Sequence, residues 1–312
     1  MRRSLVIFLW LVSFSYFSSA DEPKEKSFEL LNGDRVLFLG NSFFERALEY
    51  GYLETAIALS FPDRDITFRN VGWDGDTVFG HSRTGGRRRA VFGDVEEGFQ
   101  KMVEHVRQLK PSVIFLAYGA NESFAGLGGV DNFKKGLQNL IEALGDGGKV
   151  RFVFISPLPV SPKFLPDPSY LKQRNASLMA YSKVLSTVAS KLRYPFVDLL
   201  GPLVNTEFTT NGLHPNGNGY RLIAEEVTDQ LNLPSARIKL TSSKSEELRL
   251  TIIKKNLLYF HRWRPRNDAF VYGERKNEQK IAQTEPAQFE PFILKKESRI
   301  VEILKTITSE TQ

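Results

Sequence analysis

The stretch RVLFLGNSFFERALEYGYLETAIALSF, residues 35–61, joins a short apolar run to a helical pattern. The run RVLFLG ends at Gly40, and Ser42, a residue type that often caps helices, follows almost at once. A buried strand that passes into a helix through so short a turn is typical of α/β folds. Residues 35–61 therefore predict a strand followed by a helix, and the fold depends on whether this unit recurs.

The unit does recur along the chain. Further apolar runs, each bounded by Gly, Pro, Asn or Asp, are ITFRNVG (66–72), SVIFLAYG (112–119), RFVFISPL (151–158) and YPFVDLL (194–200). Helical patterns separate them at 96–110, 131–144, 173–192 and 217–231. Strands that alternate with helices predict a three-layer α/β/α sandwich with a central parallel sheet.

Residues 1–20, MRRSLVIFLWLVSFSYFSSA, have the pattern of a secretory signal peptide. Two arginines precede an apolar run over residues 5–17, and small residues stand before Asp21. We predict cleavage before Asp21 and a secreted or periplasmic mature chain. An uncleaved membrane anchor is the alternative, but the run is shorter than the ~20 residues of a spanning helix. No second run of that length follows, so the mature chain is not expected to insert stably into a membrane.

The composition excludes several classes of protein. Hydrophobic residues make up 41% of the chain and charged residues 25%, which predicts a folded protein. The formal charge of +6 falls to +4 without the two arginines of residues 1–20. So small an excess does not favour nucleic-acid binding. The chain has no cysteine, which excludes disulfides and cysteine-ligated metal sites.

The mature chain divides into a linker at 21–32, an α/β domain at 33–232 and an extension at 233–312. The extension begins with a polar, linker-like stretch and continues with the apolar TIIKKNLLYF and a basic, aromatic segment. It ends with apolar residues at helical spacing between 298 and 307, which predict a short amphipathic helix. We expect the extension to pack on the α/β domain, with a small separate module as the alternative.

Four residues that could carry chemistry stand at the predicted strand ends or directly before a helix. Ligands of doubly wound sheets bind at the carboxyl ends of the strands. Ser42 lies near a helix N-terminus, where an oxyanion is stabilised, and Gly75 lets a backbone N–H approach a ligand. Asn121 can aim an amide N–H at negative charge, and His214 can act as a base. Taken singly, each also fits an ordinary turn or helix cap.

Taken together, the four residues resemble the SGNH (GDSL-type) esterase and acylhydrolase superfamily. The motifs that carry the resemblance are VLFLGNS (36–42), NVGWDGDT (70–77), YGANES (118–123) and NGLHPNGNGY (211–220). They occur in the family's order, and the resemblance covers residues 33–232. It implies a flavodoxin-like sandwich. The stretches SFFERALEYGYLETA (42–56), FPDRDITFRNVGWDGDTVFG (61–80) and LLYFHRWRPRND (257–268) also look like those of exported members found in planctomycetes and their relatives.

The resemblance assigns a role to each residue. It makes Ser42 the nucleophile and His214 the general base. Gly75 and Asn121 complete an oxyanion hole with the backbone N–H of Ser42. Such a site forms an acyl-enzyme that water then hydrolyses, and it needs no metal or organic cofactor.

Three positions depart from the family's pattern. Asn41 replaces the usual Asp before the serine, and Glu122 replaces the Asp that usually follows the asparagine. Both changes are expected to be peripheral. Asn211 replaces the acid three residues before His214, and this change bears on activity. An acid there holds the imidazole and stabilises the imidazolium, and an Asp to Asn change in a serine protease costs ~10⁴ in kcat.

Three arrangements for His214 remain open. The Asn211 side chain could orient the ring, a main-chain carbonyl near residue 211 could do so in a Ser-His dyad, or another carboxylate could approach. Glu207 is the nearest acid in the sequence.

Other candidates are weaker. His81 and Ser82 are adjacent, and neighbouring side chains rarely face each other productively. His105 is expected to be solvated. Trp73 and Arg83 are candidate substrate-binding residues, since a basic cluster that starts at Arg83 and includes residues 87–89 follows the second motif. It is either a solvated loop or a site for an acidic group on a glycan.

The predicted function is that of an exported serine esterase that acts on small acyl esters, including O-acetyl groups on glycans. The alternative is a weak or inactive protein that keeps the same fold and binds acylated glycans. A structural role for the basic, aromatic tail in an envelope assembly is a third reading. The sequence contains no pattern that sets an oligomeric state.

Overall fold

The computed structural model describes residues 28–83, 95–161, 163, 167–204, 207–234, 240–271, 273 and 275–311. Within them, five parallel strands form one sheet in the order β2-β1-β3-β4-β5. The strands are β1 (Arg35–Gly40), β2 (Thr67–Asn70), β3 (Val113–Ala117), β4 (Arg151–Ile155) and β5 (Phe196–Val197). The predicted α/β/α sandwich with a parallel sheet is confirmed. The predicted signal peptide lies outside the described residues.

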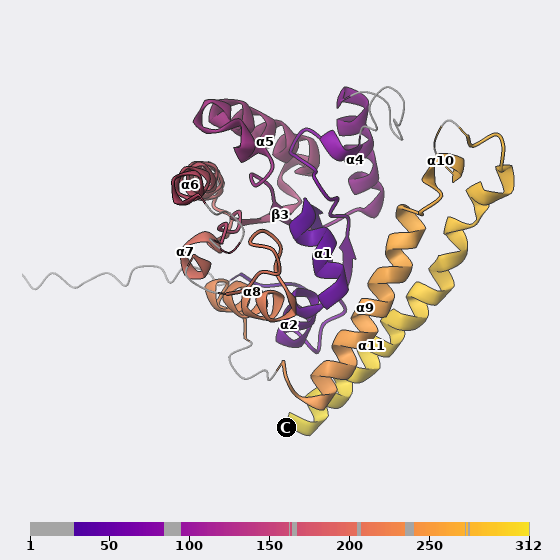
Figure 1. Ribbon diagram of the computed structural model, residues 1–312. Coiled ribbons are helices and arrows are strands. Elements are labelled where there is room, and N and C mark those ends of the chain that lie inside the picture. Colours follow the sequence, from indigo (N-terminus) through magenta and orange to yellow (C-terminus); the bar gives the residue numbers. More distant parts are fainter. Residues whose placement is uncertain are drawn as a thin grey trace, which may run out of the picture.

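The helices follow the strands in the predicted alternation (Figure 1). Their bounds are α1 (Ser42–Tyr50), α2 (Tyr52–Ser60), α4 (Val95–Leu109), α5 (Val130–Leu144), α6 (Pro168–Leu192), α7 (Leu200–Leu203), α8 (Gly217–Gln230), α9 (Ser243–Trp263), α10 (Asp268–Val271) and α11 (Glu290–Thr311). Among the described residues, no helix is long and apolar enough to cross a membrane.

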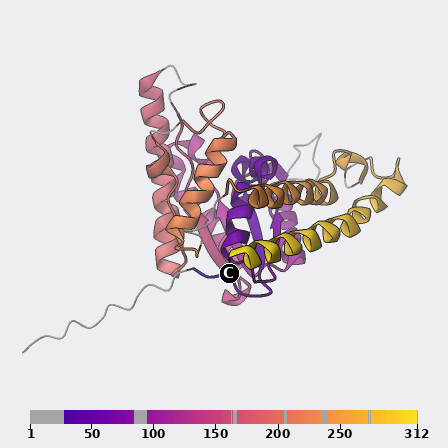
Figure 2. The same ribbon diagram turned by 90° about the horizontal axis from the view of Figure 1, so that it is seen from below.

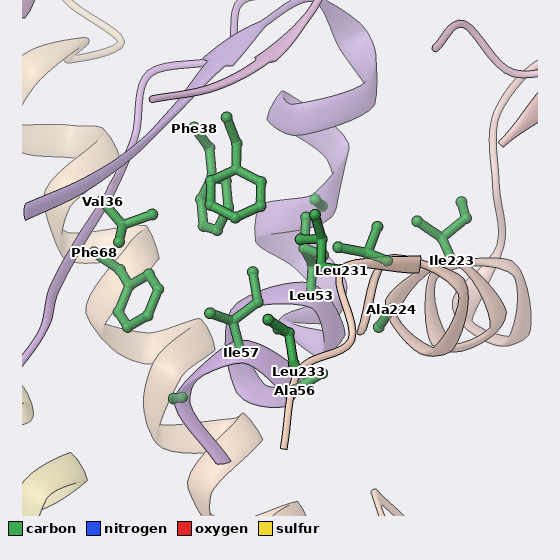
Figure 3. Packing of buried hydrophobic residues seen from close by; sticks show 14 of the residues in the cluster. Val36, Phe38, Leu53, Ala56, Ile57, Phe68, Ile223, Ala224, Leu231 and Leu233 are labelled. Atoms are coloured by element: carbon green, nitrogen blue, oxygen red, sulfur yellow. The ribbon is translucent and has the colours of Figure 1, made fainter. Parts of the chain in front are cut away.

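Both faces of the sheet are covered, which explains why its central strands, β1, β3 and β4, are nearly continuous apolar runs. Alternate residues of β1 belong to two different cores. Phe38 belongs to the core of one face, together with Ile57 of α2 and Ile223 of α8 (Figure 3). Leu39 belongs to the core of the other face, with Leu137 of α5 and other residues of α4, α5 and α6. The sandwich therefore holds the carboxyl ends of its strands on a rigid base.

Helices α9 and α11 of the extension pack against each other and cover the β2 edge of the sheet. They lie at the end of the molecule opposite α6 (Figures 1 and 2). Lys255 of α9 donates to the main-chain oxygen of Phe68 on β2, at 3.2 Å, and pairs with Glu54 of α2. Asn256 donates to the same carboxylate at 2.8 Å. A helix that covers an edge strand also protects it from pairing with other chains.

The helices of the extension are longer than the sequence pattern indicated. Helix α9 begins at Ser243, inside the stretch interpreted as a polar linker. Helix α11 runs from Glu290 to Thr311, well beyond the predicted helix at 298–307.

Candidate active site

Ser42 is the first residue of α1 and directly follows the carboxyl end of β1. The helix is capped by Asn41, whose side-chain oxygen accepts the Phe43 N–H at 3.1 Å. The turn is tight, since a Cβ atom on Gly40 would lie 2.5 Å from the main-chain oxygen of Ala117 on β3. Ser42 thus lies at the positive end of a helix dipole, and its hydroxyl does not cap the helix.

Gly75 lies in the loop after β2 and points its backbone N–H at Ser42. The Gly75 nitrogen is 3.4 Å from Ser42 Oγ. Its φ of +76° favours glycine, and a Cβ atom would lie 3.0 Å from Ser82 Oγ. The loop therefore presents a main-chain donor beside the predicted nucleophile, where an oxyanion would form.

Asn121 follows β3 and holds a fixed position next to the Gly75 loop. Its Nδ2 atom donates to the main-chain oxygen of Asp76 at 2.8 Å. An amide nitrogen carries two hydrogens, so one remains for a ligand. This bond links the loop that carries Asn121 to the loop that carries Gly75, so the two predicted oxyanion donors lie on adjoining loops.

His214 lies in a compact turn before α8 and lines the same cavity as Ser42 and Asn121. The turn is closed by a bond from the Thr210 N–H to the main-chain oxygen of His214, at 2.9 Å. In the described part of the chain, no hydrogen bond joins His214 to Ser42. Such catalytic bonds are often long in unliganded enzymes and shorten when the substrate binds.

Asn211 shapes this turn through its side-chain oxygen. That atom accepts the N–H of His214 at 2.8 Å and the N–H of Leu213 at 3.2 Å. A carbonyl oxygen has two lone pairs, and both are used here. Of the three arrangements left open for His214, orientation of the ring by the Asn211 oxygen is not the one seen here, because that oxygen holds the backbone that carries His214.

Two charges act on the His214 ring from α1 and the Gly75 loop. Burial lowers the pKa of His214, and the positive charge of Arg46 lowers it further, while the carboxylate of Asp74 raises it. Arg46 and Asp74 form a partly exposed ion pair of 4.0 Å. Glu207 is exposed and is not among the charges that shift this pKa. The carboxylate that shifts the pKa of His214 is thus that of Asp74. Asp74 lies far from His214 in the sequence, so this effect could not be predicted.

Asp76 is fully buried beneath the Gly75 loop and holds it in place. One carboxylate oxygen accepts from Arg83 Nε at 3.0 Å and from the Tyr118 hydroxyl at 3.1 Å. The other accepts from the Ser82 N–H at 3.3 Å. A buried carboxylate needs this many partners to offset its lost hydration.

Arg83 is therefore an interior residue, which corrects its assignment as a substrate-binding candidate. It is 3% exposed, pairs with Asp76 and donates to the main-chain oxygen of Val71 at 2.9 Å. The other arginines of the predicted basic cluster, at 87–89, lie outside the described residues.

Trp73 is also buried, so it too is corrected as a substrate-binding candidate. It is 8% exposed and meets the Trp263 ring edge-on at 5.6 Å. The guanidinium of Arg264 lies 4.1 Å from the centre of the Trp73 ring and pairs with Glu45 at 2.7 Å. Glu45 in turn accepts the Asp74 N–H. The extension thus braces the loop that carries Gly75.

Glu122, expected to be peripheral, connects the second and third motifs. One of its carboxylate oxygens accepts the Val78 N–H and the other the Gly119 N–H, each at 2.8 Å. Burial, with a contribution from the negative charge of Asp76, raises the pKa of Glu122 to about 7, against the opposing effect of these hydrogen bonds. The residue after Asn121 therefore joins the loop that carries Gly75 to the loop that carries Asn121.

The rival pair of His81 and Ser82 has other contacts. The Ser82 hydroxyl donates to the main-chain oxygen of Asp74 at 2.7 Å, and His81 Nδ1 lies 2.8 Å from Thr77 Oγ1. Both residues support the Gly75 loop.

The cavity has a volume of about 120 Å³ and opens beside Ser42. Its polar lining includes Asn41, Ser42, Asn121, Ser156, Arg174 and His214, and its apolar lining includes Phe124, Leu158, Val160, Leu178 and Leu213. Within the described ranges, no group of three or more acidic or histidine side chains is placed to hold a metal ion. The site can thus bind a small, partly apolar molecule next to a hydroxyl, a histidine and oxyanion donors.

Residues 38–222 match the model of the GDSL-like lipase/acylhydrolase family. The match covers more than half of the chain, so the chain belongs to this family, and its class is that of carboxylic ester hydrolases. The resemblance found in the four sequence motifs is thereby confirmed. No curated protein matches the chain.

Several solved structures are similar to the chain at low identity. A catalytic mutant of Axe2, an acetylxylan esterase from Geobacillus stearothermophilus, is 17% identical over 68% of this chain and 100% of its own, with a TM-score of 0.51. A gut microbial diltiazem-metabolizing enzyme is 18% identical over 65% of this chain, with a TM-score of 0.48, and the match spans 48% of that enzyme. A GDSL-like lipase from Bacteroides thetaiotaomicron is 20% identical over 64% of this chain and 88% of its own, with a TM-score of 0.44.

Proposed function

We propose that this chain is an exported serine esterase that cleaves small acyl esters through an acyl-enzyme on Ser42, with His214 as the base. The observation that carries the proposal is the Gly75 N–H aimed at Ser42 Oγ, 3.4 Å away, next to an Asn121 amide held on the adjoining loop. Donors placed around a hydroxyl in this way suit a tetrahedral oxyanion. His214 lines the same cavity and supplies the acid-base group.

In the acylation step, Ser42 Oγ attacks the ester carbonyl carbon as His214 takes the hydroxyl proton. The carbonyl oxygen becomes an oxyanion, which accepts from the N–H groups of Ser42 and Gly75 and from Asn121 Nδ2. The intermediate then collapses: the bond to the alcohol oxygen breaks, and His214 gives its proton to the leaving alcohol.

In the deacylation step, water takes the place of the alcohol. His214 removes a proton from the water as its oxygen attacks the acyl carbon of Ser42. The same donors hold the second oxyanion, and the bond to Ser42 Oγ breaks as His214 returns the proton to it. The products are a carboxylic acid and the free serine.

The proposed substrate class is that of small acyl esters, with O-acetyl groups on glycans as its leading member. The modest cavity suits a short acyl group, and the fold is shared with an acetylxylan esterase. Export rests on the signal-peptide pattern of residues 1–20.

The test is labelling of the mature protein with a fluorophosphonate probe, together with turnover of p-nitrophenyl acetate. We expect both in the wild type and neither in Ser42→Ala, with turnover strongly reduced in His214→Ala. The matched control is Ser82→Ala, which removes the rival hydroxyl and should still be labelled. Labelling that persists in Ser42→Ala, or that is absent from the folded wild type, would overturn the proposal.

A second candidate, a weak or inactive protein that binds acylated glycans, is favoured by one observation. The side-chain oxygen of Asn211 is used by the backbone, and among the described residues no carboxylate bonds to the His214 ring. Binding of an acetylated glycan without hydrolysis, unchanged in Ser42→Ala, would support this function.

A further inference from the structure

Arg174 is a buried cation in the wall of the proposed catalytic cavity. It lies on α6, is 8% exposed and lines the same cavity as Ser42, Asn121 and His214. Its Nη1 atom donates to Ser123 Oγ at 2.7 Å and its Nη2 atom to the main-chain oxygen of Ala120 at 2.9 Å. The guanidinium is thus fixed beside the loop that carries Asn121.

The charge of Arg174 has no counter-charge in the part of the chain that the structure describes. Arg83 and Lys255, the other buried cations there, pair with Asp76 and Glu54. Arg174 forms no ion pair with the described residues, and the Phe124 ring, 3.8 Å from its guanidinium carbon, is a weaker partner than a carboxylate. Burial lowers the pKa of Arg174. A buried charge of this kind is costly unless a ligand neutralises it.

The guanidinium keeps donors for such a ligand. An arginine has five N–H groups in a planar fork, and the protein uses two of them here. Nε of Arg174 has no partner among the described residues and is not one of the buried atoms that lack a partner, so it is accessible, and the side chain lines the cavity. A planar fork is matched best by a carboxylate or another oxyanion.

We infer that Arg174 binds an anionic group, foremost a carboxylate, on the ester that Ser42 cleaves. The inference rests on the proposed function and names its substrate class. Arg174 bonds to Ala120, the residue next to Asn121. One small molecule can therefore place its anion at Arg174 and its ester carbonyl at Asn121. Phe124, Leu158 and Leu178 line the same cavity and would contact the apolar part of such a substrate.

The same chemistry admits two sources, because the carboxylate can belong to the acyl half or to the alcohol half of the ester. Two substrate pairs separate them. For the alcohol half, the pair is 4-acetoxybenzoate and 4-acetoxybenzamide. For the acyl half, it is monomethyl glutarate and its terminal amide, methyl glutaramate. Each pair differs in one charge and keeps its size.

We expect kcat/KM to favour the charged member of one pair by about 10- to 100-fold, the range of a hydrogen-bonded charge. The preference should vanish in Arg174→Gln and survive in part in Arg174→Lys, which keeps the charge but loses the fork. Equal kcat/KM for charged and neutral members of both pairs in the wild type would overturn the inference.

A purely structural role for Arg174, as a brace of the Asn121 loop, gives a different result. The matched control is Ser123→Ala, which removes one bond of the brace and leaves the guanidinium in place. A brace alone predicts that Arg174→Gln and Ser123→Ala lower kcat for charged and neutral esters alike. Substrate binding predicts that only Arg174→Gln changes the ratio between them.

A binding measurement distinguishes failure of the anion site from failure of the proposed function. Calorimetry of Ser42→Ala with 4-acetoxybenzoate and 4-acetoxybenzamide needs no turnover. Tighter binding of the anion that is lost in Ser42→Ala/Arg174→Gln supports the anion site even if the wild type hydrolyses nothing. Ser42-dependent turnover of p-nitrophenyl acetate with no anion preference in either assay leaves the esterase standing and removes the anion site.

Discussion

The backbone nitrogen of Gly75 lies 3.4 Å from the Oγ atom of Ser42 and donates toward it. The two residues come from different strand ends, and the relationship depends on a loop whose φ at Gly75 is +76°. Most L-residues avoid that conformation. The donor is therefore placed by a backbone shape that only glycine adopts without strain.

Replacing Gly75 with alanine should move this donor. The added Cβ atom meets Ser82 Oγ at 3.0 Å in a strained backbone, so the loop has to shift. We expect a loss of about 100-fold in kcat on p-nitrophenyl acetate, the range for a lost oxyanion donor, with the far-UV circular dichroism unchanged. Gly128→Ala is the control, since nothing lies within 4 Å of its Cβ position. Equal kcat values for the two variants would contradict the assignment.

The acidic limb of the pH profile should report the charges on His214. The base works only when neutral, so a lower pKa extends activity to lower pH. Asp74 raises the pKa of His214 and Arg46 lowers it. Asp74→Asn should therefore move the acidic limb of kcat/KM to lower pH, and Arg46→Gln should move it to higher pH. The exposed Glu207→Gln is the control and should leave the limb unchanged. Shifts of the same sign in the first two variants would exclude His214 as the titrating base.

Glu122 should make stability depend on pH between its unfolded and folded pKa values, 4.5 and about 7. The raised pKa means that the folded state binds the proton more tightly, so the stability that Glu122 contributes is greatest below pH 4.5 and is lost as the pH rises through about 7. At about 1.4 kcal/mol per pKa unit, the loss is up to about 3 kcal/mol.

Glu122→Gln cannot ionise and should lack this fall. It also places an amide N–H₂ against a backbone donor, Val78 or Gly119, which should cost about 1–3 kcal/mol in the free energy of unfolding. Urea unfolding at several pH values measures both effects. Glu122 interacts electrostatically with Asp76, Tyr118 and Tyr181. These three residues are present in both proteins, so the difference between the two pH profiles comes from residue 122. Parallel pH profiles would contradict the raised pKa.

The sheet could be predicted because its central strands, β1, β3 and β4, are buried on both faces. A strand such as β1, with Val36 and Phe38 in one core and Leu37 and Leu39 in the other, has to be apolar throughout. The four family residues could be found for a related reason: each stands next to a strand end or a helix start that the pattern marks.

The supporting residues could not be found, because their roles depend on partners that no local pattern reveals. Glu122 bonds to Val78, and Arg174 bonds to Ala120. His105 was expected to be solvated, but it stacks on Trp263 at 5.1 Å, and burial lowers its pKa to about 3. These contacts depend on the arrangement of whole helices.

Helix α9 could not be predicted from the sequence as a single helix, for a further reason. Its buried face contains Leu248, Ile252 and Tyr259, but also Lys255 and Asn256. Buried polar residues interrupt the apolar stripe by which an amphipathic helix is recognised.

Arg264, at the end of α9, should affect activity through the loop it braces. Arg264→Met removes the ion pair with Glu45 and the contact with the Trp73 ring. We expect slower fluorophosphonate labelling, by a factor of about ten for roughly 1.4 kcal/mol of lost positioning, in a protein that remains folded. Arg262→Met is the control, because Arg262 pairs with the exposed Glu290 instead. If both variants label at the wild-type rate, the extension does not position the catalytic loop.

The attachment of α9 should depend on the buried pair of Lys255 and Glu54. Both side chains are nearly inaccessible, and Asn256 donates to the same carboxylate. Lys255→Met leaves the Glu54 charge buried without its cation, which should cost about 3–5 kcal/mol in the free energy of unfolding. Glu54→Gln/Lys255→Met removes both charges and still offers Asn256 an acceptor, so it should be more stable than Lys255→Met alone. Urea unfolding of the wild type, both single variants and the double variant completes the cycle. A double variant whose cost equals the sum of the two single costs would show that the two charges do not interact.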